Sequence, residues 1–215
     1  MLLAEEDGRG DQGFGGDLRY KGASTGLEGA DAICQEIARR VCFGHKTWHA
    51  FLSASTVDAV DRIGDGPWYD FDGKLAADSP SDIINNSADR LPGGCCDDGT
   101  YDEMGLYHNH KVDVNGDGVG DDDDHDTLTG STPQGRLDTS ASTCDDWTST
   151  TASGQPRIGH MWPRMGLTGF GANWASDHTA GGCAAGITLT NSGGAGGSNT
   201  VGSAGGYGAI YCFAE

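Results

Sequence analysis

Residues 111–126, KVDVNGDGVGDDDDHD, hold a dense set of oxygen ligands. Counted from Asp113, side-chain oxygens fall at positions 1, 3, 5, 9 and 12 of a loop, a backbone carbonyl falls at position 7, and Gly118 falls at position 6. Calcium takes roughly six to eight oxygen ligands, which alternate side chains bent around a glycine turn can supply. The spacing therefore predicts a calcium site whose ligands are Asp113, Asn115, Asp117, the carbonyl of Val119, Asp121 and Asp124.

A solvated acidic run is the alternative interpretation of this segment. A random run of acids does not place glycine, asparagine and aspartate in this register, so we favour calcium. Asp124 stands where EF-hand loops carry glutamate, and its shorter side chain predicts a lower affinity. We expect a structural rather than a catalytic ion, with Asp122, Asp123 and Asp126 binding a second ion or facing water.

Histidines flank the same segment. His108 and His110 are two residues apart, which on a strand directs both rings to one face, and His125 follows the acidic run. Together with an aspartate or Cys95 they could form a zinc site. We favour surface histidines here, because no fourth ligand has a diagnostic spacing.

The segment GASTG, residues 22–26, matches the GxSxG pattern of a nucleophilic serine at Ser24. A hydrolase of that type needs several strand–helix units to deliver an acid and a histidine, whereas this chain offers one strong helix. We therefore interpret the segment as a turn in which Ser24 or Thr25 caps the helix that follows. A serine hydrolase that uses Ser24 remains the second alternative function.

Composition restricts the classes of protein. The chain has 215 residues and a net charge of −19, which argues against nucleic acid, heparin and anionic membranes as partners. Glycine accounts for 37 residues, about twice the usual share, so we expect one loop-rich domain. Residues 1–17 predict a flexible lead-in, and residues 18–215 predict the domain, with an acidic insertion at 97–126.

Seven cysteines without a CxxC motif indicate an oxidising compartment, and their odd number leaves at least one thiol without an internal partner. The opening residues MLLAEEDGRG lack the features of a signal peptide, so we expect any such signal to have been removed or to lie outside this numbering. No apolar run approaches the length of a membrane span. We expect a secreted or cell-surface protein that does not insert into a membrane.

Apolar spacing predicts few regular elements. Residues 25–41 place apolar side chains at steps of three and four, which predicts an amphipathic helix. Residues 47–55 alternate as a strand does, and a short helix is expected directly after them. Later segments are short and β-prone, separated by glycine, proline, serine and threonine. Residues 190–206 predict a low-complexity loop or the tip of a hairpin.

The order of several segments resembles the endostatin-like branch of the C-type-lectin fold in bacterial secreted domains. These segments are GADAICQEIARRV, WHAFLSAS, FDGK, TGSTPQGRL, CDDW, a late Cys183 and the terminal AIYCF. The inserted acidic loop is similar to a thrombospondin type 3 repeat. The resemblance implies an α+β fold with a small irregular antiparallel sheet and one main helix. It also implies nested disulfides, Cys34 with Cys212 and Cys144 with Cys183, and leaves Cys42 to pair with Cys95 or Cys96.

This chain departs from the family at its known sites. Its charge and the absence of histidine before His45 remove the heparin and zinc sites of endostatin. Only GQPR and CDDW come near the calcium-dependent sugar site of the wider fold, and Arg157 would repel a cation there. Trp162 and Trp174 are the side chains that sugar stacking would use, although tryptophans in such segments are more often part of the core.

These observations predict a non-catalytic extracellular structural or adhesion module that calcium stabilises and that assembles with itself through glycine-rich loops. A calcium-dependent carbohydrate-binding domain is the alternative. The expected partners are a surface protein, a glycan or another copy of the chain. We expect no enzymatic activity, because no nucleophile, base and orienting group can be placed on one supporting frame.

Overall fold

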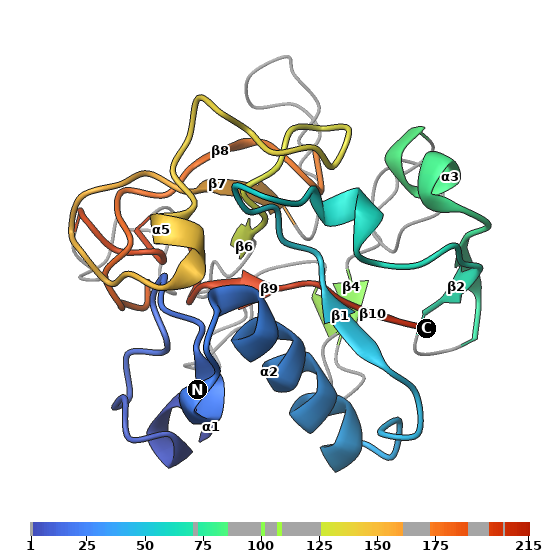
Figure 1. Ribbon diagram of the computed structural model, residues 1–215, viewed down its shortest axis with the longest axis horizontal. Coiled ribbons are helices and arrows are strands. Elements are labelled where there is room, and N and C mark those ends of the chain that lie inside the picture. The colour runs from blue at the N-terminus through green and yellow to red at the C-terminus, as the bar shows by residue number, and fades with distance from the viewer. Residues whose placement is uncertain are drawn as a thin grey trace, which may run out of the picture.

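The main helix forms where the apolar spacing predicts it. The computed structural model describes residues 2–70, 73–85, 100–101, 107–108, 126–160, 173–188, 198–203 and 205–215. Helix α2, Gly26–Arg40, begins with a capping box in which the Thr25 hydroxyl accepts from the Glu28 amide at 3.2 Å. Its buried face includes Ala30, Ile33 and Cys34, and the helix packs against β1 (Figure 1). The predicted helix is therefore confirmed.

The other helical segments within the described ranges are short. They are α1 Leu2–Glu6, α3 Pro80–Asn85, α5 Cys144–Trp147 and the 3-10 turns η1 Tyr20–Gly22 and η2 Ala59–Asp61. Turn η2 stands where a short helix was expected after residue 55. Segment α5 is a left-handed turn rather than a regular helix, because its four residues have φ between 51° and 64°.

In the described residues, ten short strands make up four sheets. They are β1 Trp48–Ala50, β2 Trp68–Tyr69, β3 Leu75–Ala77, β4 Thr100–Tyr101, β5 Tyr107–His108, β6 Asp126–Leu128, β7 Arg157–His160, β8 His178–Thr179, β9 Ala209–Ile210 and β10 Cys212–Ala214. The largest sheet has the order β8-β7-β6-β9, and the pairs β1–β10, β2–β3 and β4–β5 form two-stranded sheets. The fold class is α+β, as expected. The expectation of a purely antiparallel sheet is wrong, because β9 pairs with β6 in parallel.

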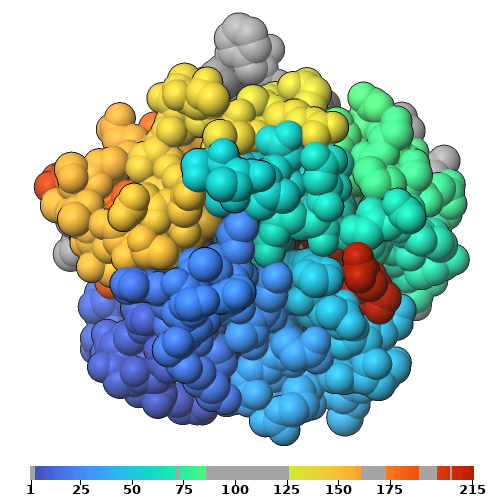
Figure 2. All heavy atoms as spheres, viewed as in Figure 1, coloured from blue at the N-terminus to red at the C-terminus, as the bar shows by residue number. Residues whose placement is uncertain are grey.

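The strand expected over residues 47–55 is shorter than predicted. Only Trp48–Ala50 pairs, antiparallel to β10 at the C-terminus. Residues 51–54 then run through the interior with every side chain buried, so the alternation in the sequence does not correspond to two faces of a sheet. On the surface, the end of the C-terminal strand emerges beside the segment that follows η2, at residues 63–67 (Figure 2).

The described part of the core consists of two apolar clusters. One joins α2 to Trp147, Leu128 and Ile158, and the other gathers around Phe51, Ile63 and Trp174. Both disulfides of the first cluster join the pairs that the resemblance implies: Cys34 with Cys212, and Cys144 with Cys183. Cys42 is an exposed free thiol, so the third bridge expected at this residue is not formed.

Residues 2–17, expected to form a flexible lead-in, lie against the domain instead. Leu3 belongs to the first core cluster. The Arg9 guanidinium donates to the backbone carbonyls of Asp17 at 3.0 Å and Arg19 at 2.8 Å, and it also forms an ion pair with the Asp17 carboxylate at 3.1 Å. Arg9, one of the charged residues that suggested a solvated segment, thus ties residues 2–17 to the start of the domain at Arg19.

Candidate metal centre

Three side chains converge from three adjacent strands of the four-stranded sheet. Asp126 of β6 lies directly opposite His160 of β7, and His178 of β8 lies opposite Ile158. Ile158 and His160 are two residues apart on one strand, so their side chains share a face. Asp126 and His178 flank β7 from its two sides and lie on that same face. Antiparallel pairing thus brings a carboxylate and two imidazoles together from positions 52 residues apart in sequence.

The three candidate ligand atoms form a nearly equilateral triangle. Nε2 of His160 lies 3.3 Å from Nε2 of His178, and Oδ1 of Asp126 lies 3.6 Å and 3.5 Å from these two nitrogens. A circle through the corners of this triangle has a radius of about 2.0 Å. An ion at its centre would therefore lie at the distance typical of zinc–nitrogen and zinc–oxygen bonds, about 2.0–2.2 Å.

Two of the three candidate ligands are buried. Asp126 is 1% exposed and His160 is 7% exposed. A buried carboxylate needs positive charge or hydrogen-bond donors nearby, and two imidazole nitrogens that face each other at 3.3 Å cannot both direct a proton into the space between them. A divalent ion at the centre would neutralise the carboxylate and accept both nitrogen lone pairs.

Backbone contacts hold the strands that carry the ligands. The His160 amide donates to the Asn173 carbonyl at 3.1 Å, and the Asp177 amide donates to the Ile158 carbonyl at 2.8 Å. A β-carbon at Gly159 would lie 1.7 Å from the Trp174 carbonyl oxygen, so only glycine allows this close approach beside His160. The position of His160 is therefore set by tight backbone packing on the strand that carries it.

Two polar groups surround the centre. Oδ2 of Asp177 lies 3.3 Å from Nε2 of His160, although Asp177 is not one of the three mutually close ligands. The Tyr211 hydroxyl donates to the Trp174 carbonyl at 3.0 Å. Burial, and secondarily the negative charge of Asp126, raise the pKa of Tyr211 against the opposing effect of a hydrogen bond with Thr127. Tyr211 is therefore neutral at neutral pH and acts as a hydrogen-bond donor near Asp126.

The ligands predicted for calcium lie outside the described residues: Asp113, Asn115, Asp117, Val119, Asp121 and Asp124. His110, His125 and Cys95 lie outside them too, and only the backbone position of His108, in β5, is described. Asp126, the residue of the acidic segment that the structure describes, belongs to a possible metal site. Sequence reasoning missed His160 and His178, because no motif links two histidines on strands that pair across a loop.

Two alternatives from the sequence occupy structural positions. The Ser24 hydroxyl donates to the Glu28 carboxylate at the start of α2, which agrees with its interpretation as part of a helix cap. Trp174 is buried, with its ring centroid 4.6 Å from that of Phe51, so it is a core residue rather than a platform for a sugar. Trp162 lies outside the described residues.

The two segments whose sequences are similar to a lectin calcium site, GQPR and CDDW, also make structural contacts. Arg157 forms an ion pair with Asp138 at 2.6 Å, and Asp146 accepts hydrogen bonds from the amide and the hydroxyl of Ser55. These contacts tie together loops of the domain. Their charged groups therefore serve the packing of the described structure.

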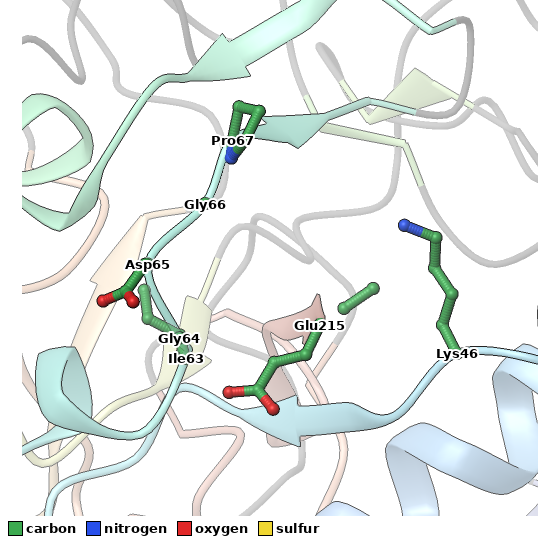
Figure 3. A pocket seen from close by; sticks show the side chains of 8 residues that line it. Lys46, Ile63, Gly64, Asp65, Gly66, Pro67 and Glu215 are labelled. Carbon is green, nitrogen blue, oxygen red and sulfur yellow. The ribbon is translucent and has the colours of Figure 1, made fainter.

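A separate hollow of about 460 Å³ lies beside the C-terminus. It is lined by Lys46, residues 63–67, Ala214 and Glu215 (Figure 3). The view shows the amine of Lys46 and the carboxylate of Glu215 on different sides of an open space. No side chains converge in it as they do at the Asp126–His160–His178 group.

Within the described parts of the chain, no helix is both long enough and apolar enough to cross a membrane. The two disulfides indicate an oxidising environment. Comparison with known proteins finds no family model that matches this chain and no curated protein with significant similarity to it.

Proposed function

We propose that this protein is an extracellular binding module that holds a divalent transition metal ion, zinc in the first place, through Asp126, His160 and His178. The observation that carries the proposal is the triangle of ligand atoms, whose centre lies about 2.0 Å from each corner. The ion would cross-link three strands that have few residues each. It would thereby add to the two disulfides seen among the described residues, whose regular elements are short.

Ligand chemistry favours zinc over calcium at this centre. Two of its three candidate ligand atoms are imidazole nitrogens, which suit zinc, copper, iron and nickel, whereas calcium takes oxygens. Calcium–ligand distances of about 2.3–2.6 Å would also place the ion well out of the plane of the three atoms. Copper shares the ligand preference of zinc, and measured metal content will distinguish the two.

Calcium is a second proposal, at a different place. It rests on the spacing of carboxylates in residues 113–124, which is that of a calcium loop. An ion that binds the folded state stabilises it by mass action. Melting curves in millimolar calcium and in chelator should therefore differ, and identical curves for protein stripped of metal would contradict a calcium loop.

The resemblance to the endostatin-like branch of the C-type-lectin fold supports a role in display and recognition. We propose that the module has no enzymatic activity and binds a surface protein, a glycan or another copy of itself through its loops. Light scattering with and without metal, followed by a glycan array, would test these partners. The role would be contradicted by a protein that stays monomeric, binds no glycan on the array and hydrolyses an ester through Ser24.

Metal content tests the centre directly. The native protein, dialysed against zinc and then against buffer, should retain about one zinc ion per chain by mass spectrometry of the metal. His160→Gln and His178→Gln should each lose it. His45→Gln, at an exposed histidine outside the centre, is the matched control and should retain it. Equal zinc content in all four proteins would contradict the assignment, provided that circular dichroism shows them equally folded.

A further inference from the structure

The groups around the candidate metal centre differ in their access to solvent. The side chains of Asp126 and His160 are 1% and 10% exposed, whereas those of Asp177 and His178 are 27% and 37% exposed. An ion bound by the first pair and His178 would therefore be enclosed on one side. In the part of the chain that the structure describes, solvent reaches it on the side of Asp177 and His178.

The number of ligands leaves one coordination position to fill. Zinc takes about four ligands, and zinc sites with three protein ligands keep a water or an external molecule in the fourth position. Among the described residues, three ligand atoms form the mutually close group. Asp177 lies 3.3 Å from Nε2 of His160 without joining that group, so its carboxylate stands beside the coordination sphere.

Asp177 is held in this place by its backbone. Its amide donates to the Ile158 carbonyl at 2.8 Å, and its carbonyl accepts from Arg157 at 3.3 Å. The residue is therefore anchored to β7, the strand that also carries His160. A carboxylate anchored there would accept a hydrogen bond from a water or hydroxyl on the ion, and its charge would repel an anion.

We infer that the metal centre keeps an exchangeable fourth position on its Asp177 side, and that Asp177 makes this position select a neutral, hydroxyl-bearing ligand over a bare anion. The inference rests on the proposed metal binding and adds to it a ligand class. Asp177 is here a positioning residue, since it acts on the external ligand through its charge and its hydrogen bond.

Cobalt(II) in place of zinc provides the test, because its visible spectrum reports the ligands of the ion. The full-length protein loaded with cobalt is titrated with azide, a bare anion, at constant ionic strength. The native protein should show a spectral change that saturates at high azide concentration. Asp177→Asn removes one negative charge beside the position and should lower the azide dissociation constant roughly five- to tenfold.

A matched control separates a local effect from a general one. Asp65→Asn removes the same charge from a loop at the hollow beside the C-terminus and should leave the azide constant unchanged. A cobalt spectrum that no azide concentration alters would show a closed site and overturn this inference alone. An azide constant that Asp177→Asn leaves unchanged or raises would overturn the role of Asp177. Absence of any cobalt spectrum would overturn metal binding as well.

Discussion

At the scale of single residues, the burial of Asp126 has the clearest consequence. Its carboxylate lies in the interior beside two imidazoles, and a divalent ion is the partner that fits all three. Asp126→Asn keeps the shape of the side chain and removes its charge. We expect the variant to lose the rise in melting temperature that zinc gives the native protein.

The size of this effect follows from mass action. At a zinc concentration about 100 times the dissociation constant, binding stabilises the folded state by about 2.7 kcal/mol. Differential scanning calorimetry of both proteins, in zinc and in chelator, measures the difference. If zinc raises the melting temperature of Asp126→Asn as much as that of the native protein, the carboxylate is not a ligand.

The sequence singles out only one of the three residues in this centre. Asp126 stands in an acidic run, so its type and neighbours draw attention to it. His160 and His178 are isolated histidines in short β-prone segments, and their proximity depends on the register of three strands. Register is fixed by tertiary packing of these short strands, so a single sequence does not reveal the site.

At the scale of elements, the turn α5 shows a strained backbone fixed by its surroundings. Residues 144–147 all have positive φ, a conformation that costs an L-residue about 1–2 kcal/mol. The Trp147 ring nitrogen donates to the Ser53 carbonyl at 2.8 Å, and a disulfide holds Cys144. These buried anchors hold the turn, whereas Asp145 in the middle of it is exposed.

Replacement of Asp145 by glycine should therefore stabilise the protein. Its φ is 57°, and glycine adopts this conformation without the cost of a β-carbon. The gain is offset in part by the greater freedom of glycine in the unfolded chain, so we expect about 0.5–1 kcal/mol in urea unfolding. Asp65→Gly, at an exposed residue outside the positive-φ positions, should instead lose stability.

Strand β7 depends on a close approach that only glycine permits. A β-carbon at Gly159 would lie 1.7 Å from the Trp174 carbonyl oxygen, which is backbone and cannot rotate away. Gly159→Ala should destabilise the protein by roughly 1–3 kcal/mol and weaken zinc binding, because it displaces the strand that carries His160. Gly73→Ala is a useful comparison. A β-carbon at Gly73 would meet no atom within 4 Å. The Gly73→Ala variant should therefore lose only the stability that a φ of +78° costs an alanine, and it should retain its zinc affinity.

The elements themselves could be predicted to different degrees. Helix α2 was predictable because its apolar spacing and the Thr25–Glu28 cap are both local signals. The strands were not predictable, because most of them have only two or three residues. Residues 51–54 are all buried, so their alternation does not mark two faces of a strand. Pairing over long distances in sequence, such as β1 with β10, leaves no local pattern to read.

At the scale of the whole molecule, buried and half-buried acids link stability to pH. Burial opposes the ionisation of Asp138, but hydrogen bonds from Ser140 and the ion pair with Arg157 lower its pKa below the usual 3.8. The pKa values of Asp17 and Asp146 are lowered in the same way, by Arg9 and Arg19 and by Ser55 respectively. Such groups contribute stability above about pH 4, and the contribution is lost as the pH falls through their folded-state values.

We therefore expect the free energy of unfolding, measured by urea in the presence of chelator, to fall between pH 5 and pH 2. Asp138→Asn should be less stable than the native protein at pH 7, and the difference between the two should shrink towards pH 2. A difference that stays constant over this range would show that Asp138 contributes through packing rather than through its charge.

The two disulfides differ most in the length of chain that they close. The Cys34–Cys212 bridge spans 178 residues, and the Cys144–Cys183 bridge spans 39. In the loop-entropy model, a bridge stabilises by restricting the unfolded chain, and the longer loop should contribute about 1.3 kcal/mol more. Replacement of both cysteines of the longer bridge by serine should therefore lower the free energy of unfolding more than the same replacement in the shorter one.

The shorter bridge has a local role that works in the opposite direction. Cys144 lies in the left-handed turn α5, whose strained backbone its bridge to Cys183 helps to hold. If the turn relaxes when this bridge is removed, removal of the shorter bridge should lower the free energy of unfolding more than removal of the longer one. Urea unfolding of the two double-serine variants, with Cys42→Ser as the control at an exposed free thiol, distinguishes the cases. A greater loss of stability on removal of the longer bridge would show that the entropy of the unfolded chain dominates. A greater loss on removal of the shorter bridge would show that the support of turn α5 dominates.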